Sequence, residues 1–231
     1  YTASGTVANG NVVGAGGGIG TNLYAGSPDP DYNAIIIKDG TISGNKAEVA
    51  GAGIYVNNGK VSISDSTISN NIAAAIKGNG TVQSGGGIYV TGNKSDVSVT
   101  DSTISGNEAS QGGGVFAASN SNVELEDSTV SGNKAVEQGG GVFANTGASV
   151  TMNGGEITGN TAGNVGGGVR LHNKAVFTLN SGKISDNNAA TGGGVYSYYL
   201  TTFNMNGGEI TGNTASATGG GVFNHTANFT M

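Results

Sequence analysis

The chain has 231 residues, of which 45 are glycine, none is cysteine and only 10% are charged, with a formal net charge of -6. The lack of cysteine excludes a disulfide framework and thiolate metal sites, and the few scattered cations argue against nucleic-acid binding, which requires a basic surface. No apolar run is long enough for a transmembrane helix, so we expect no membrane insertion of this segment.

A repeat of about 27 residues fills almost the whole sequence. Each copy opens with a glycine triplet and closes on an asparagine, as in GGGVFANTGASVTMNGGEITGN over residues 139–160. Self-similarity at a fixed period is the signature of a repeat architecture. The triplets begin at Gly16, Gly51 (as GAG), Gly85, Gly112, Gly139, Gly166, Gly192 and Gly219.

The first two intervals between triplets are longer than the rest, which indicates two insertions. One lies within residues 20–33 and the other within residues 72–84, and insertions in repeat proteins map to loops. The chain begins at Tyr1 and ends at Met231 inside an incomplete copy. We therefore interpret residues 1–231 as a single β-helix segment of a longer protein.

Three short apolar alternations occur in each copy, and none has a helical period. In residues 139–160 they place Val142 after the triplet, Val150 and Met152 in a middle segment, and Ile157 in a third. Alternation over a few residues predicts strands, and a coil of short strands buries its apolar face only by stacking on other coils. The sequence predicts an all-β fold, a right-handed single-stranded parallel β-helix (solenoid) with three short strands per coil of about 27 residues and about eight coils.

Residues one period apart stack in such a fold, so the sequence is best examined as columns. The closing asparagine is the same in seven copies, which favours a ladder of hydrogen-bonded side-chain amides. A row of amides that binds a ligand is the weaker interpretation. The ladder comprises Asn45, Asn71, Asn107, Asn133, Asn160, Asn187 and Asn213.

An aromatic column follows the inward residue of each first strand and is predicted to face outward by alternation. It either stacks like rings on adjacent strands, with Arg170 as a cation–π spacer, or forms a surface stripe that binds carbohydrate or protein. The candidate stripe comprises Tyr55, Tyr89, Phe116, Phe143, Arg170, Tyr196 and Phe223.

Four aspartates form another column, which suggests either a calcium site or a row of turns. One carboxylate per coil is a poor calcium cage, so the turn interpretation is favoured. The sequence predicts no metal site and no cofactor. The column comprises Asp39, Asp65, Asp101 and Asp127.

Catalytic residues are sparse in this sequence. Arg170 is the single arginine, and no carboxylates are expected to converge on it or on the histidines His172 and His225. The best break in the repeat is the first insertion, where a carbohydrate-active enzyme would place its groups. The candidates there are Tyr24, Asp29, Asp31 and Tyr32. We expect no enzyme activity.

Triplets followed by Ile or Val and an aromatic residue, alternating with ISGN or ITGN, resemble the GGA[I/L/V] and FxxN repeats of polymorphic outer membrane proteins. These repeats form right-handed β-helical passenger regions of autotransporter-like bacterial surface proteins. The resemblance implies extracellular exposure and a role in adhesion or as a stalk. It transfers no site residue, because the matching positions are structural.

The leading hypothesis is a non-enzymatic, secreted or cell-surface β-helix that acts as a rigid stalk or adhesin. Its expected partner is a host or neighbouring-cell surface protein or glycan. One alternative is a self-assembling fibre or sheath subunit, since open coil ends are templates for end-to-end association. A second alternative is a carbohydrate-active enzyme similar to polysaccharide lyases.

Overall fold

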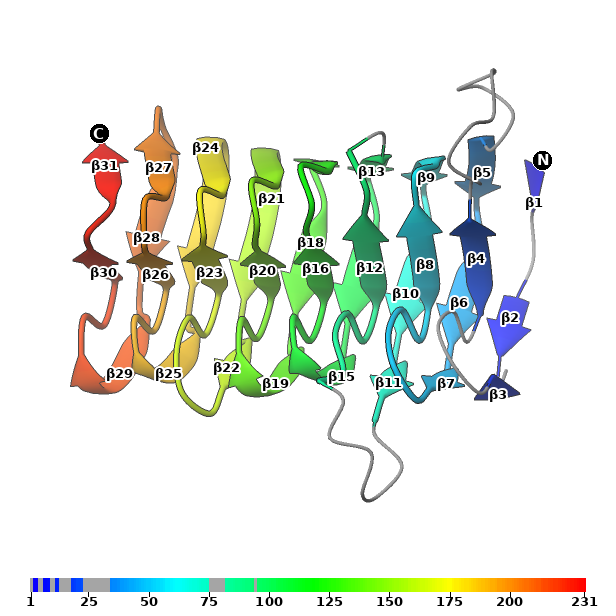
Figure 1. Ribbon diagram of the computed structural model, residues 1–231, viewed down its shortest axis with the longest axis horizontal. Helices are drawn as coiled ribbons and strands as arrows, with labels where there is room; N and C mark the ends of the chain where they lie inside the picture. The colour runs from blue at the N-terminus through cyan, green and yellow to red at the C-terminus, as the bar shows by residue number, and fades with distance from the viewer. Residues whose placement is uncertain are drawn as a thin grey trace.

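The computed structural model of the protein describes residues 2–3, 6–8, 11–12, 18–22, 34–74, 82–93 and 95–231, with side chains for 18–20, 35–74, 82–93 and 95–231. Over these residues the chain is a parallel β-solenoid of about seven turns with about 27 residues per turn, arranged as three parallel sheets (Figure 1). The predicted fold class is confirmed. The central parts of both predicted insertions, 23–33 and 75–81, lie outside the described residues, as do Tyr24, Asp29, Asp31 and Tyr32.

The strands that follow the glycine triplets form the first sheet, whose eight members run side by side along the rod (Figure 1). Their register is the one predicted, with Ile54 beside Ile88 and Val115 beside Val142. The strands are β4 (Ile19–Asn22), β8 (Ile54–Asn57), β12 (Ile88–Thr91), β16 (Val115–Ala117), β20 (Val142–Ala144), β23 (Val169–His172), β26 (Val195–Tyr198) and β30 (Val222–His225).

The middle and isoleucine segments of the repeat share a second sheet of 15 strands, because β21 (Ser149–Thr158) and β24 (Val176–Ser185) run through both segments. The middle segments are β1 (Thr2–Ala3), β5 (Ala34–Lys38), β9 (Lys60–Ser64), β13 (Asp96–Thr100), β17 (Asn122–Glu126), β27 (Thr202–Met205) and β31 (Asn228–Thr230). The isoleucine segments are β2 (Thr6–Ala8), β6 (Thr41–Ser43), β10 (Thr67–Ser69), β14 (Thr103–Ser105), β18 (Thr129–Ser131) and β28 (Glu209–Thr211).

The third sheet lies after the closing asparagine, where the sequence analysis placed no strand. Its inward positions are alanines such as Ala109 and Ala135, whose small side chains give no clear apolar alternation. The strands are β3 (Asn11–Val12), β7 (Lys46–Ala47), β11 (Ile72–Ala73), β15 (Glu108–Gln111), β19 (Lys134–Gln138), β22 (Thr161–Ala162), β25 (Asn188–Thr191) and β29 (Thr214–Thr218).

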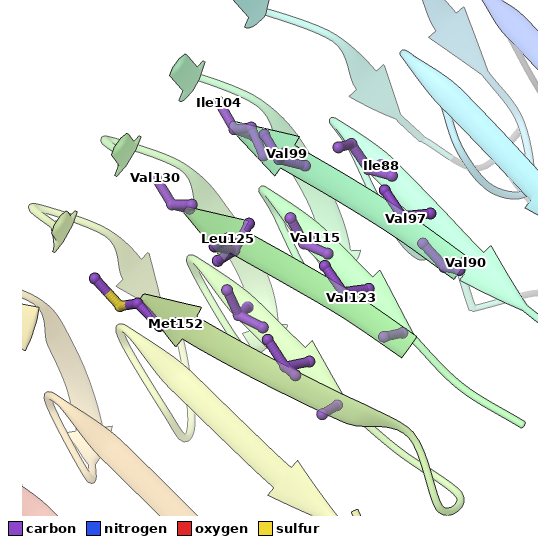
Figure 2. Close-up of a cluster of buried hydrophobic side chains, with 14 of the residues drawn as sticks. Ile88, Val90, Val97, Val99, Ile104, Val115, Val123, Leu125, Val130 and Met152 are labelled. Atoms are coloured by element: carbon purple, nitrogen blue, oxygen red, sulfur yellow. The ribbon is translucent and has the colours of Figure 1, made fainter. Parts of the chain in front are cut away.

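The main apolar core runs inside the rod and is built from the columns that the repeat predicts (Figure 2). In one coil Val142, Val150, Met152 and Ile157 are all buried. Each stacks on its counterparts in the coils before and after, as Val150 does on Val123 and Phe177. Burying a side chain of this size contributes about 1.5–3 kcal/mol, so the stacked columns hold the coils together.

The aspartate column occupies turns of the second sheet. Asp39, Asp65, Asp101 and Asp127 all have φ between 44° and 51°, a left-handed conformation that aspartate, asparagine and glycine tolerate best. Gly154, the counterpart of Asp127 in the next coil, also has positive φ, at 95°. The shared conformation accounts for the exchange of Asp for Gly along this column.

Candidate binding surface

The closing asparagines form a buried hydrogen-bonded ladder inside the rod. Asn160 Nδ2 donates to Asn187 Oδ1 and to the Val130 carbonyl, both at 2.9 Å. Asn160 Oδ1 accepts from the backbone N–H of Asn133 at 2.9 Å and from Asn133 Nδ2 at 3.0 Å. All the hydrogen-bonding capacity of this amide is directed at protein atoms, so Asn160 holds neighbouring coils together and has no amide group left for a ligand.

Two glycines of each triplet have different steric roles. The first, Gly139, turns the chain at φ 66°, and a Cβ there would lie 2.6 Å from Phe143 Cβ. The third, Gly141, faces the closing asparagine of the same coil, and its Cβ would lie 3.0 Å from Asn160 Nδ2 and 2.7 Å from the Gly168 carbonyl oxygen. The triplet and the asparagine therefore fit each other, and an alanine at the third position has no room.

The aromatic column lies outside the main core, on the outer face of the first sheet. Its rings stack along the rod, with centroids 5.3 Å apart between Tyr55 and Tyr89 and 5.2 Å apart between Tyr89 and Phe116. Phe143 meets Phe116 edge-on at 5.1 Å. The column thus makes the ring contacts that the stacking interpretation requires.

The column is not a continuous exposed stripe. The exposed fraction is 6% for Phe116 and 2% for Phe143, and Arg170 is 5% exposed. These side chains lie between like neighbours and against the glycine corner, which covers more of each ring than alternation alone suggests. Tyr55, Tyr89, Tyr196 and Phe223 are half-buried, so only these ring members remain partly open to solvent.

Arg170 interrupts the column with a charge. Its guanidinium carbon lies 4.4 Å from the Tyr196 ring centroid and 5.8 Å from that of Phe143. Nε donates to Gln138 Oε1 at 3.3 Å, and Nη1 donates to the Leu171 carbonyl. Burial lowers the pKa of Arg170 to about 10, partly offset by Tyr196 and Tyr198, so the group is a cation at neutral pH.

A second column lies two residues further along the same strands, and the sequence analysis missed it. His172, Tyr198 and His225 stack with centroids 5.8 and 5.3 Å apart. His172 Nδ1 lies 3.2 Å from Asn145 Oδ1 in the preceding coil. Burial, followed by the charge of Arg170, lowers the pKa of His172. The spacing of 26 and 27 residues between these three positions was the signal that would have revealed the column.

The turn after β26 exposes two large apolar side chains in a strained conformation. Tyr199 and Leu200 have φ of 64° and 58° and are 49% and 59% exposed. The same two turn positions hold Thr-Gly at 146–147 and Asn-Lys at 173–174 in the preceding coils. Together, Tyr196, Tyr198, Tyr199, Leu200 and His172 form what we term the aromatic patch.

The histidines and Arg170 form no ion pair with a carboxylate in the part of the chain that the structure covers. No group of three or more His, Cys, Asp or Glu side chains lies close enough to hold a metal ion among the described residues. His172 and His225 are separated by the Tyr198 ring, and Arg170 makes no ion pair with a described carboxylate. Within the same ranges, no helix has the length and hydropathy to cross a bilayer.

Comparison with known proteins identifies a fold family but no individual relative. A family model described as a right-handed β-helix region matches residues 30–231. No curated protein and no solved structure matches the chain.

Proposed function

The chain belongs to the right-handed β-helix family, and on this basis we propose that it is a rigid, non-enzymatic rod, secreted or held at the cell surface, that binds a partner through the aromatic patch. The partner is a protein or glycan on a host or neighbouring cell. In this role the solenoid serves as the stalk, and the patch on the outer face of its first sheet supplies the adhesive contact.

The single observation that carries the proposal is the Tyr199–Leu200 turn. A non-glycine residue in the left-handed region costs about 1 kcal/mol or more, and bulky residues are the least tolerated there. Leaving both side chains half-exposed also forgoes the stabilisation that burial would give. The turn is thus unfavourable for folding on two counts, whereas the preceding coils hold small or polar residues there, Thr-Gly at 146–147 and Asn-Lys at 173–174. Contact with a partner is the function that would retain these side chains.

The setting of the turn also favours binding. Tyr198 and Tyr199 lie with ring centroids 6.2 Å apart, and His172 stacks on Tyr198 at 5.8 Å, so the patch is held in place before a partner arrives. Pre-ordered tyrosines bury a large area at a small entropic cost. The repeat's resemblance to polymorphic outer membrane proteins supports placing the rod outside the cell.

The test exchanges the turn residues for those that other coils use. In the double variant Tyr199→Asn, Leu200→Gly, the new residues are those of Asn173 and Gly147 at the same turn positions. The fluorescently labelled chain is applied to cultured cells and to immobilised extracellular proteins, and bound chain is measured by flow cytometry and surface plasmon resonance. We expect the native chain to bind and the double variant to lose at least about tenfold in affinity while unfolding at a higher temperature.

The matched control is Val136→Ser. Val136 on β19 is 59% exposed, like Leu200, but lies in the third sheet, away from the patch. Unchanged binding in this control, with loss in the double variant, assigns the contact to the patch. Protease and glycosidase treatment of the cells then distinguishes a protein partner from a glycan. Native-like binding by the double variant would refute the proposal.

A further inference from the structure

Arg170 stands at a position where the fold favours an aromatic ring. Every other member of the column from Tyr55 to Phe223 is an aromatic residue in contact with a neighbouring ring, and Arg170 is the single arginine of the chain. Removing a guanidinium from water without an opposite charge is costly, and cation–π contacts return only about 0.5–2 kcal/mol. A tyrosine or phenylalanine would continue the stack without that cost. Stability therefore gives no reason for the arginine.

The guanidinium has hydrogen-bonding capacity left over. Its five N–H donors include Nε–H, which Gln138 engages, and one of the Nη1 hydrogens, which the Leu171 carbonyl accepts. Nη2 has no acceptor among the described residues. Nη2 is also not one of the fully enclosed side-chain atoms that lack a partner, so it keeps some contact with solvent although the whole side chain is only 5% exposed. A cation with free donors thus lies at the base of the patch, against the rings of Phe143, Tyr196 and Tyr198.

The surrounding rings favour an anion over an apolar ring or a flat sugar. Tyr198 is stacked between His172 and His225 at interplanar angles of 1° and 19°, so its two faces are already occupied. Stacked rings turn their electropositive edges and their hydroxyl groups outward. Exposed Lys174 lies in the neighbouring turn, where its backbone N–H donates to the Tyr199 carbonyl at 3.3 Å.

We propose that Arg170 is the anion-recognising centre of the aromatic patch, and that it takes a carboxylate from an acidic side chain of a protein partner, whose adjacent apolar side chain packs on Tyr199 and Leu200. This inference rests on the proposed binding role of the patch and adds the chemistry of the partner. A guanidinium matches a carboxylate in geometry as well as charge. Leu200 favours a protein partner over a glycan, because an exposed aliphatic side chain complements an apolar side chain better than it complements a hydroxylated sugar.

The single arginine makes a direct experiment possible. With one guanidinium in the chain, the ¹⁵Nε–Hε signal of Arg170 is unique in an NMR spectrum. The probe is 4-methylpentanoate, which joins a carboxylate to a leucine-like chain, and the control probe is the uncharged 4-methylpentanamide. We expect the acid to shift the Arg170 Nε–Hε and Leu200 methyl signals in a saturable manner, with an affinity at least about tenfold above that of the amide.

Two variants separate the contributions. Arg170→Tyr restores the residue type of its neighbours and keeps the fold, and the Leu200 methyl signals of this variant should respond equally to acid and amide. Tyr199→Asn, Leu200→Gly should weaken the response of Arg170 to the acid while leaving the acid preferred. Equal affinity for acid and amide in the native chain, or an acid preference that survives Arg170→Tyr, would overturn the inference.

Cell binding distinguishes failure of this inference from failure of the proposed function. If Arg170→Tyr binds cells as tightly as the native chain while the Tyr199–Leu200 variant does not, the patch is adhesive but Arg170 is a stacking spacer. If the Tyr199–Leu200 variant binds normally, the adhesive role itself is refuted, whatever the NMR titration gives.

Discussion

Replacing one buried ladder asparagine should destabilise the rod far more than replacing an exposed one. Asn160→Ala removes four hydrogen bonds, two donated by Nδ2 and two accepted by Oδ1. At about 1 kcal/mol for each bond, the loss is about 4 kcal/mol. The orphaned partners include the buried N–H of Asn133 and the Val130 carbonyl, and an unsatisfied buried group costs about 1–3 kcal/mol, so this figure is a lower estimate.

Asn180→Ala is the matched control, because this asparagine also belongs to a stack of amides. Asn180 Nδ2 donates to Asn153 Oδ1 at 2.7 Å, and Asn180 Oδ1 accepts from Asn206 Nδ2 at 2.8 Å, but both bonds are exposed. Water replaces exposed partners, so the free energy of unfolding should change by no more than about 0.5 kcal/mol.

Urea unfolding followed by circular dichroism measures both variants, and hydrogen exchange of the Asn133 amide locates the effect in the ladder. The exchange of this amide should accelerate in Asn160→Ala and stay slow in Asn180→Ala. A change below about 1 kcal/mol in Asn160→Ala, or equal changes in the two variants, would refute the assignment of coil cohesion to the buried ladder.

Three further predictions test the packing and the charges. Gly141→Ala places a Cβ 2.7 Å from the Gly168 carbonyl oxygen and should lower the free energy of unfolding by about 1–3 kcal/mol. Gly20→Ala is the control, because open space surrounds this position, and it should change the free energy of unfolding by less than about 0.5 kcal/mol in the same urea titration. Arg170→Tyr should raise the free energy of unfolding by about 1 kcal/mol or more, because it removes a buried cation without an acidic partner. His172 has a folded-state pKa below its ordinary value of 6.5, so its contribution to stability is full above that pH and declines as the pH falls from 6.5 toward the folded-state pKa. His172→Asn should reduce this acid-side loss in thermal unfolding measured between pH 7.5 and pH 5, and an unchanged pH profile would contradict the shift.

The period of the sequence was sufficient to predict the columns, because stacking in a solenoid follows directly from residue spacing. Val142 on Val169 and Asn160 on Asn187 are examples in which the register follows from counting alone. The third sheet escaped prediction, because alanines such as Ala135 pack inward without producing a recognisable apolar alternation. Hydrophobic periodicity does not reveal a strand whose buried side chains are all small.

The binding surface was harder to predict than the core. Alternation predicts that Phe143 lies on the outer face of the first sheet, but it does not predict that the ring is buried. The burial depends on a glycine corner formed four residues earlier. The Tyr199–Leu200 turn was missed for a different reason. Its distinguishing feature is a pair of bulky apolar side chains at positive φ, which becomes evident only when the two positions are compared with Gly147 and Asn173 in other coils.

Because each coil contacts only its nearest neighbours, the length of the rod changes in steps of one coil. Each coil bonds to the one before and the one after in the same register, as Tyr55, Tyr89 and Phe116 illustrate. Duplicating one whole repeat upstream of residue 139 would therefore move Tyr199 and Leu200 by one strand spacing, about 4.8 Å, without altering any of their contacts. The number of glycine–asparagine repeats therefore sets how far along the rod the aromatic patch lies, and this distance can change without any change in the residues of the patch.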